Sequence, residues 1–486
     1  MNLEEEINQL EISVKQLELE QKEHYSINKE IDEYLFDFLN SLADKKGFEK
    51  DFSPSELIFK NKINNQGYPL KEILSLFEEA VNTNGIQPAS GGHLGYIPGG
   101  GVPLAAYGDL IAAMTNKYSG VYYANPGAIN IENHLLDWCA KIFDFDTASY
   151  GGNLTTGGSI ANLISIVSAR DKHQVKGKDY ERTVIYGSEQ MHHSLHKAIR
   201  ISGLGECIFK KIPLDEKFHI NTNILKEQIE KDHSDGLKPF LIIASAGTTD
   251  TGIIDDLDQL SAIATKNNCW LHVDAAYGGF FYLLDDQKSK FKGIEKADSL
   301  VIDPHKGLFM PYGSGVVLIK NKEHLLHSNH YLANYMQDAY KDQSQLSPAD
   351  LSPELSRNFR GMRMWLPLMY HGIEVFKNGL KEKLLLTHYA YQELKKLDFI
   401  ELGPFPELSV FTFRFKDRSI DNNELNKLIL NELHKDGKIF ISSTTINNDI
   451  WLRIAILSFR THKREVDLLI TMVKKHFSQH VVSLHG

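Results

Sequence analysis

The middle of this chain alternates short apolar runs with amphipathic stretches. Short continuous apolar runs are typical of strands buried in a sheet. The segments that contain such runs begin at Arg182, Pro239, Cys269, Ser299 and Ser314. Residues 159–171 and 256–267 instead place apolar side chains three and four positions apart, as in helices that cover a sheet. This alternation predicts an α/β fold with a mostly parallel sheet.

The first 45 residues follow a different pattern. Their apolar positions recur four and three residues apart with charged residues between them, at Leu3, Ile7, Leu10, Val14 and Leu17. Such spacing predicts an amphipathic helix. The helix either packs on the body of the protein or forms an arm that builds a dimer.

The C-terminal part begins with a polar segment. Residues 342–356 contain two prolines and predict a mobile loop, and residues 363–380 predict one long helix. Strands are predicted at 409–415 and 451–457. This part therefore reads as a smaller α+β unit.

The chain has 486 residues, which is more than one ordinary domain contains. We expect an N-terminal helical segment over residues 1–90, a large α/β domain over 91–345 and a small α+β domain over 346–486. A glycine-rich stretch that begins at Ala89 marks the first boundary.

Composition narrows the classes of partner. The net charge of −10 and the lack of a dense Lys/Arg block argue against binding to nucleic acid or to an anionic membrane. No run of about 18 apolar residues is present, and the acidic N-terminus does not resemble a signal peptide. Three widely separated cysteines and no metal-ligand spacing predict a cytoplasmic protein without disulfides or a bound metal.

Two ionisable residues follow predicted strands. Asp274 ends the run that begins at Cys269, and Lys306 follows the run that begins at Ser299. Open α/β sheets bind ligands at the carboxyl ends of their strands. An amine and a carboxylate at neighbouring strand ends suit pyridoxal phosphate, because the amine can form a Schiff base with the aldehyde and the carboxylate can keep the pyridine nitrogen protonated.

The phrases around these two residues carry a family resemblance. HVDAAYGG, from His272, and DPHKGLFMPYGSG, from Asp303, resemble the group II pyridoxal-phosphate-dependent amino-acid decarboxylases, which include aromatic-L-amino-acid and glutamate decarboxylases. The similarity extends from about Gly91 to Arg460. It implies a fold-type I enzyme, a homodimer with active sites at the subunit interface, and Lys306 as the residue that carries the cofactor in an internal aldimine.

The resemblance also implies further cofactor-binding residues. The glycine-rich segment 151–163 leads into a predicted helix, so Gly158 and Ser159 are candidates for binding the phosphate. His305 matches a family histidine beside the phosphate and the substrate carboxylate. Ala276 matches a small residue that packs against the cofactor ring.

For two further cofactor-binding roles, an adjacent residue of the same type is an alternative. His192 matches the family imidazole that stacks on the ring and can move protons there, with His193 as the alternative. Thr249 matches a threonine near the ring hydroxyl, with Thr248 as the alternative. Catalysis is therefore expected from Lys306, His192 and Asp274.

Candidates for the substrate side are Tyr96, Arg360 and Tyr335. Tyr96 lies in a segment that lines the pocket of relatives, as do Tyr122 and Tyr123, and this favours an aromatic or large apolar substrate. Arg360 matches a family arginine near the entrance, or else it pairs with a carboxylate on the surface.

The chain departs from the family at two positions. Asp303 stands where some relatives have Asn, and we expect it to point away from the phosphate or to be paired, because two negative charges repel. Aromatic decarboxylases have a loop tyrosine that protonates the substrate Cα, but counting back from Arg360 places Pro348 there. The proton for the substrate Cα would then come from Tyr335 or its neighbours Tyr331 and Tyr340. Otherwise it would come from His192 or water.

The resemblance implies α-decarboxylation of an L-amino acid to an amine and CO2 through a quinonoid intermediate. Reaction of that intermediate with oxygen would give an aldehyde instead. Carbon–carbon lyase chemistry and aminotransfer are further alternatives on this scaffold, and a binding protein would not need Lys306, Asp274 and His192 together. The expected partners are an amino-acid substrate and a second copy of the chain.

Overall fold

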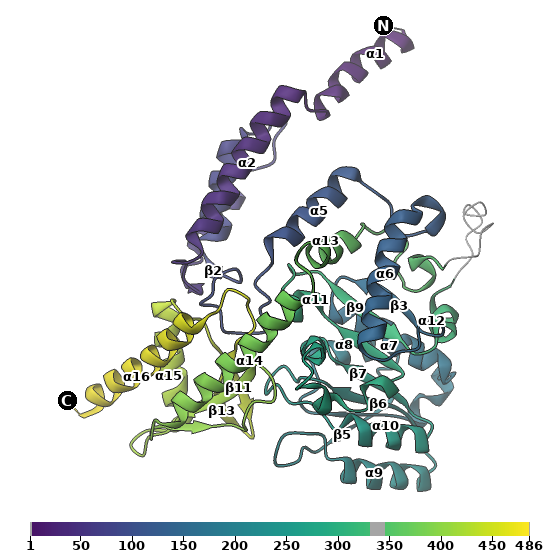
Figure 1. The fold of residues 1–486 in the computed structure, drawn as a ribbon, viewed down its shortest axis with the longest axis vertical. Coiled ribbons are helices and arrows are strands. Elements are labelled where there is room, and N and C mark those ends of the chain that lie inside the picture. Colours follow the sequence, from purple (N-terminus) through teal and green to yellow (C-terminus); the bar gives the residue numbers. More distant parts are fainter. Residues whose placement is uncertain (1, 331–345, 486) are drawn as a thin grey trace.

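The computed structural model describes residues 2–330 and 346–485. Figure 1 shows a body of sheets and helices and, projecting from it, an arm of N-terminal helices. A seven-stranded sheet lies in the body together with a separate four-stranded sheet. These features confirm the predicted fold class, an α/β protein with N-terminal helices and a small C-terminal sheet.

The central sheet has the strand order β3-β9-β8-β7-β6-β4-β5. Neighbouring strands are parallel, except that β9 runs against both β3 and β8. Its strands are β3 (Gly151–Thr155), β4 (Thr183–Ser188), β5 (Ile208–Ile212), β6 (Lys238–Ser245), β7 (Trp270–Asp274), β8 (Ser299–Ile302) and β9 (Gly315–Ile319). Each apolar run that predicted a strand in this sheet forms one.

Strand β3 was not predicted. Its sequence, GGNLT, indicates a turn, yet all its residues are buried and pair with β9. A Cβ on Gly152 would lie 2.9 Å from the carbonyl oxygen of Val317, so the glycine permits close pairing with β9. The predicted turn is therefore limited to the residues between β3 and the next helix.

Helices cover both faces of the central sheet. On one face lie α7 (Gly158–Lys172), α8 (His193–Ile201) and α12 (Lys322–Asn329), and on the other lie α6 (Pro126–Ile142), α9 (Thr222–Ser234) and α10 (Leu257–Lys266). The residues of β7 alternate between two apolar cores, with Leu271 and Val273 in one and Trp270 in the other. The helices predicted at 159–171 and 256–267 are α7 and α10.

The C-terminal sheet is antiparallel, with the order β10-β11-β13-β12. Its elements are α13 (Gly361–His371), α14 (Glu374–Lys395), β10 (Ile400–Leu402), β11 (Val410–Phe415), α15 (Asn422–Asp436), β12 (Ser442–Ile446), β13 (Asp449–Ala455) and α16 (Lys463–His485). The prediction of one helix over 363–380 is wrong. Gly372 separates α13 from α14 with a φ of 70°, which residues other than glycine rarely adopt.

The segment before α13 is packed where the structure describes it. Pro348 is buried in a short 3-10 turn, and its carbonyl accepts a hydrogen bond from Asn153 Nδ2 at 3.0 Å. The prediction of a mobile loop is therefore wrong for residues 346–356. The rest of that predicted loop lies outside the described residues.

The N-terminal arm contains two helices in place of one, α1 (Leu3–Val14) and α2 (Gln21–Ser41). The five apolar residues that predicted a helix are between 53% and 83% exposed, so they do not pack on the body of their own chain (Figure 1). The arm continues through α3 (Leu57–Lys60) and α4 (Leu70–Phe77), and β1 (Phe48–Glu49) pairs with β2 (Gly85–Ile86) before α5 (Pro103–Thr115).

Within the described ranges, no helix is both long and apolar enough to span a bilayer. In the same residues, no group of three or more His, Cys, Asp or Glu side chains is placed to hold a metal ion. Cys139, Cys207 and Cys269 are all free thiols.

Candidate active site

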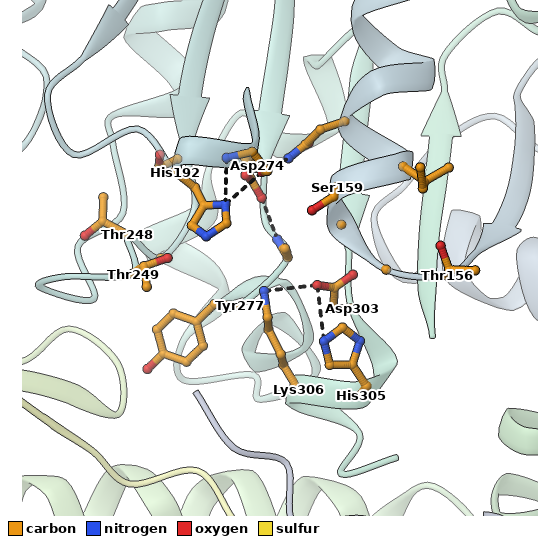
Figure 2. A pocket seen from close by; sticks show the side chains of 18 of the residues that line it. Thr156, Ser159, His192, Thr248, Thr249, Asp274, Tyr277, Asp303, His305 and Lys306 are labelled. Atoms are coloured by element: carbon orange, nitrogen blue, oxygen red, sulfur yellow. Dashed lines mark hydrogen bonds and ion pairs between the residues drawn. The ribbon is translucent and has the colours of Figure 1, made fainter. Parts of the chain in front are cut away.

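A cavity of about 390 Å³ opens at the carboxyl ends of the central strands. The segments that follow β3, β4, β6, β7 and β8 supply its walls (Figure 2). An open α/β sheet is expected to bind its ligand at this edge. The predicted site residues in these walls are Gly158, Ser159, His192, Thr249, Asp274, Ala276, His305 and Lys306.

Lys306 and Asp274 line this one cavity from neighbouring strands. Asp274 is the last residue of β7, and Lys306 lies in the short helix α11 (Pro304–Gly307) that follows β8. Because β7 and β8 are parallel and pair Asp274 with Val301, both strands end at the same edge of the sheet. The structure thus brings together the amine and the carboxylate expected at neighbouring strand ends.

Hydrogen bonds fix the orientation of the Asp274 carboxylate. Oδ1 accepts from the backbone N–H of Ala276 and Oδ2 accepts from Nδ2 of Asn162, both at 3.1 Å. Asp274 is only 8% exposed. Since neither donor carries a charge, the carboxylate can offer its own charge to a cationic group of a ligand.

The start of α7 forms an anion cradle on another wall. Gly157, which precedes the helix, has a φ of 140°, a backbone conformation that residues other than glycine rarely adopt. No side chain caps this end of the helix. A Cβ on Gly158 would lie 3.0 Å from Asp303 Oδ2, so this position also requires a small residue. Backbone N–H groups at a helix start suit a phosphate, and the Ser159 side chain lines the same wall (Figure 2).

Asp303 lies in the cavity wall beside Lys306. Its Oδ2 is 3.0 Å from Lys306 Nζ and 3.7 Å from His305 Nε2, and the residue is 1% exposed. Of the two expectations for Asp303, pairing is therefore the one observed, and an orientation away from the site is wrong. The neighbouring ammonium offsets the repulsion that this carboxylate would exert on an anion.

His192, and not His193, lies in the cavity wall. It precedes α8 as its N-cap, and its Nδ1 is 2.7 Å from Ser194 Oγ, while His193 is exposed. Burial lowers the pKa of the His192 imidazole below its usual value, which favours the neutral ring. His192 is thus placed to contact a flat ligand and to exchange a proton with it.

Thr248 and Thr249 both line the cavity, but their hydroxyls differ. The Thr248 hydroxyl is held within its own turn, 2.8 Å from Thr251 Oγ1, and it accepts from Ile253 N at 3.1 Å. Thr249 is fixed through its backbone, because its carbonyl accepts from Arg453 Nε at 2.7 Å. The Thr249 side chain is therefore the better placed of the two for a ligand.

His305 belongs to α11 and lies beside the anion cradle. Its Nδ1 donates to the carbonyl of Ser314 at 2.5 Å, which leaves Nε2 toward Asp303. Burial lowers the pKa of His305 as well. Ala276 lies two residues beyond Asp274 in the same wall, close to Gly158.

The substrate-side candidates are not in this cavity. The Tyr96 ring is 5.7 Å from the Phe440 ring and the residue is 55% exposed, so Tyr96 packs beside the small sheet. Arg360 forms a bidentate ion pair with Glu354 at 2.7 Å and donates to the Leu154 carbonyl at 3.1 Å. Tyr96 and Arg360 thus lie outside the cavity of a single chain, and their role toward the substrate stays a prediction. Tyr335 lies outside the described residues.

Sequence reasoning missed several wall residues, among them Asn162, Gln190, Tyr277 and Tyr312. Asn162 is three residues after Ser159 on α7, so helical spacing could have placed both on one face. Tyr277 belongs to the quoted phrase HVDAAYGG, but its hydroxyl is 2.8 Å from Ser409 Oγ and also accepts from Ser409 N at 2.8 Å. That contact with the C-terminal part had no signal in the sequence.

The donors and charges of this cavity fit pyridoxal phosphate. The uncapped start of α7 suits the phosphate, the Asp274 carboxylate suits a protonated pyridine nitrogen, and the Lys306 amine suits the aldehyde. Roughly 300–1,000 Å³ is usual for a small-molecule site, and the cavity volume falls in that range.

Comparison with known proteins agrees with this chemistry. A family model described as pyridoxal-dependent decarboxylase conserved domain matches residues 59–416. The chain is 29% identical over 469 residues to an aromatic-L-amino-acid decarboxylase of Bacillus atrophaeus, covering 94% of this chain and 96% of that protein. It is 27% identical over 403 residues to a phenylacetaldehyde synthase of Petunia hybrida, covering 78% and 79%.

A solved structure has the same fold. The crystal structure of Oryza sativa TDC with PLP and tryptamine superposes with a TM-score of 0.89 at 21% identity, over 95% of this chain and 99% of that one. The family model spans most of the chain, including every wall residue named above from Gly157 to Tyr312. The chain therefore belongs to the pyridoxal-dependent decarboxylase family, and it is an amino-acid decarboxylase whose cofactor is pyridoxal 5'-phosphate.

Proposed function

We propose that this enzyme removes the α-carboxyl group of an L-amino acid with an aromatic or large apolar side chain and releases the amine and CO2. The observation that carries the proposal is the single cavity that Lys306, Asp274 and the uncapped start of α7 line together. The printed name of the Bacillus atrophaeus relative, an aromatic-L-amino-acid decarboxylase, supports the choice of substrate class.

The two charged residues take complementary roles in this proposal. Pyridoxal phosphate, when bound, supplies an aldehyde that captures amines and a ring that accepts the electron pair left when CO2 departs. Lys306 lines the cavity with an amine that could bind that aldehyde until a substrate amine replaced it. Asp274 holds a proton at the pyridine nitrogen, because its negative charge favours the protonated ring.

The remaining wall residues orient the ring and its phosphate. Gly158 and Ser159 bind the phosphate at the start of α7, with His305 beside it. His192 would contact the ring and could exchange a proton with the substrate, and the small side chain of Ala276 would leave room for the ring. Thr249 would offer its hydroxyl to the ring. By holding the cofactor and the substrate in place, these residues would fix the orientation of the bond to the carboxylate.

We also propose that the working enzyme is a homodimer. The apolar side chains of α1 and α2 are exposed, and an apolar groove of about 530 Å³ runs between α2 and α5 and shares His305 and Tyr312 with the cavity wall. A second subunit would cover both. Tyr96, Arg360 and Tyr335 stay substrate-side candidates only in that dimer, since the first two lie outside the cavity of a single chain.

Two further assignments are proposed with the dimer. The division into residues 1–90, 91–345 and 346–486 is supported by the separate sheets and by the projecting arm, and limited proteolysis tests it. A cytoplasmic location is supported by the free thiols, two of which are buried. Fractionation of cells that produce the protein tests the location.

A product assay tests the proposed reaction. Purified holoenzyme is incubated with each of the twenty amino acids, and CO2, amine, aldehyde and hydrogen peroxide are measured. We expect amine and CO2 in equal amounts from an aromatic or large apolar amino acid. Release of a keto acid without CO2 would show aminotransfer and would overturn the proposal.

Formation of an aldehyde is the second candidate. Pro348 stands where the loop tyrosine of aromatic decarboxylases was expected, and its burial keeps it in a structural role. A relative at 27% identity is a phenylacetaldehyde synthase. In the same assay, this reaction would consume oxygen and yield aldehyde, ammonia and hydrogen peroxide with the CO2, so the two candidates give separate products.

A further inference from the structure

Alternate residues of β7 carry polar groups on the face that α7 covers. Trp270, His272 and Asp274 lie two residues apart and therefore point to the same side of the sheet. All three are buried, and so is Asn162 of α7, which is 1% exposed. The polar atoms of this face must consequently bond to one another rather than to water.

These groups form one continuous chain of hydrogen bonds. Trp270 Nε1 donates to Ser299 Oγ at 2.8 Å, and Ser299 Oγ is 2.8 Å from His272 Nδ1. His272 Nε2 is 3.0 Å from Asn162 Oδ1. Asn162 Nδ2 then donates to Asp274 Oδ2 at 3.1 Å and to Ser194 Oγ at 3.2 Å.

Simple valence rules give the chain one direction. An ionised carboxylate has no proton to donate, so Asn162 must turn its NH2 group to Asp274 and its oxygen to His272. His272 then carries its proton on Nε2, and its Nδ1 accepts the proton of Ser299. Indole nitrogen can only donate, which fits Trp270 at the far end. Burial lowers the pKa of His272 to about 4, so the ring is neutral and has a single proton to place.

The second branch reaches His192. Because Ser194 Oγ accepts from Asn162, its own proton is free for His192 Nδ1, 2.7 Å away, and Ser194 N also donates to that atom at 3.3 Å. His192 Nδ1 therefore acts as an acceptor, and the neutral ring keeps its proton on Nε2. The tautomer of His192 is thus linked, through Ser194, to the same amide that holds Asp274.

We propose that Asn162 is a positioning residue that fixes the Asp274 carboxylate and the His192 tautomer at the same time. His272, Ser299 and Trp270 hold the amide in the one orientation that serves both. Without His272, the buried amide oxygen of Asn162 would lose its donor, and the amide would be held only through its NH2 group. This inference rests on the roles proposed for Asp274 and His192 toward the cofactor.

The test uses the full-length chain, stripped of pyridoxal phosphate and reloaded with it. Asn162→Leu keeps the approximate size of the side chain and removes both donors and the acceptor. We expect a Kd for pyridoxal phosphate that is about tenfold or more higher, since a hydrogen bond to a charged group is lost. The visible absorbance of the bound cofactor should also change its pH dependence in the same direction as in Asp274→Ala.

Two milder variants keep the test decisive if Asn162→Leu does not fold. His272→Phe removes only the donor to the amide oxygen, and it should change the absorbance profile in the same direction by less. Ser194→Ala removes only the branch to His192, so it should lower kcat and alter its pH profile while the absorbance profile stays as in the wild type. Ser165→Ala, a buried change on α7 whose hydroxyl bonds only to the Ala161 carbonyl at 3.0 Å, is the matched control.

Each outcome decides the matter. If Asn162→Leu, or His272→Phe in its place, binds and titrates like Ser165→Ala, the positioning role of Asn162 is wrong while the proposed function stands. If Asp274→Ala itself behaves like the wild type, the assignment of Asp274 to the ring nitrogen is wrong, and the inference that rests on it falls as well.

Discussion

At the residue scale, Lys306 and Asp274 have different proposed roles in the site. Lys306 faces the paired carboxylate of Asp303 at 3.0 Å, whereas Asp274 is held by two neutral donors. Loss of the amine should therefore remove a covalent link, and loss of the carboxylate should remove only a charge. The two substitutions are expected to give different defects.

The substitution Lys306→Ala should abolish the visible absorbance of the bound cofactor, because no other amine is assigned to its aldehyde. Absorption spectra of the purified variant, before and after addition of pyridoxal phosphate, check this. Lys266→Ala is the matched control, since Lys266 is exposed and is 3.7 Å from Glu230 on the surface. Unchanged visible absorbance in Lys306→Ala would remove Lys306 from its assigned role.

In contrast, Asp274→Ala should retain some cofactor while turnover falls by about 10²–10³-fold, the usual cost of losing one preorganised electrostatic group. The phosphate cradle at the start of α7 is untouched by this change. Steady-state kcat together with the bound-cofactor content of the same sample measures both effects. Asp274→Asn keeps the shape without the charge, and near-normal turnover in both variants would show that the pyridine nitrogen needs no charged partner.

At the element scale, the start of α7 is the most demanding position of the site. Gly157 precedes the helix with a φ of 140°, and no side chain caps the helix. The backbone N–H groups stay available for an anion only if this conformation holds. The cradle therefore depends on a glycine conformation and not on a charged side chain.

Gly157→Ala should weaken cofactor binding, because an alanine in this conformation is strained by roughly 1–3 kcal/mol and the helix start must move. Titration of the stripped protein with pyridoxal phosphate should show a Kd raised by about tenfold. Gly177→Ala is the matched control, since a Cβ there meets nothing within 4 Å. Equal affinities in the two variants would show that the backbone at Gly157 does not shape the phosphate site.

The elements differ in how well the sequence predicts them. Apolar runs identified β4, β6, β7, β8 and β9, because strands buried on both faces leave a continuous signal. Strand β3 gave none, since its glycines serve close pairing with β9. The break at Gly372 was missed because the apolar spacing continues across it. The local pattern of apolar residues indicates which residues are buried, but it does not indicate which other elements cover them.

The same limit applies to the site. The residues at strand ends were predictable, because chain order alone places them at one edge of the sheet. Asn162 was not singled out, since its importance lies in reaching across from α7 to β7. Tyr96 and Arg360 were placed by resemblance, and local contacts with Phe440 and Glu354 hold them elsewhere in this chain.

On the scale of the whole molecule, one ion-pair cluster joins the large and small parts. His219 Nδ1 is 3.2 Å from Asp215 Oδ2, and Nε2 is 3.0 Å from Oε1 of Glu407, which precedes β11. The hydrogen bond and charge of Glu407, helped by Asp215, raise the pKa of His219 to about 9. The charged imidazole thus ties the two parts together.

The stability of the protein should therefore fall between about pH 6.5 and pH 9. A raised histidine pKa adds stability that is complete below the unfolded pKa, near 6.5, and is lost as the pH passes the folded value, for a total of up to about 3 kcal/mol. Burial raises the pKa of nearby Asp255 to about 6, so that carboxyl costs stability only as the pH rises to about 6, below the window of His219. Burial also raises the pKa of the three cysteine thiols, which costs stability only above their unfolded pKa of about 8.5.

Urea unfolding at pH 6, 7 and 8 measures the onset of this effect below the range in which the thiols contribute. His219→Gln should flatten the profile in that window, because glutamine cannot carry the charge. The exposed His233, in the last turn of α9, offers a control as His233→Gln, which should retain the wild-type profile. Equal slopes in the wild type and His219→Gln would contradict the assignment.

The exposed arm gives a prediction for assembly. Phe36→Asp combined with Leu39→Asp places charges on the apolar side of α2, where Phe36 is 66% and Leu39 is 38% exposed. Sedimentation analysis should show a dimer for the wild type and mainly a monomer for this variant, because a charge buried without a partner opposes association. Glu30→Gln, on the same helix, is the control, and a monomeric wild type would contradict the proposed homodimer.

The position of α7 has a consequence for how the cofactor site responds to motion. Ser159, which we propose binds the phosphate, and Asn162, which holds Asp274, are three residues apart, about 4.5 Å along one helix axis. A small tilt or shift of this helix would carry both anchoring points together and would leave their separation unchanged. In the proposed site, α7 would therefore set the distance between the points that hold the two ends of the cofactor.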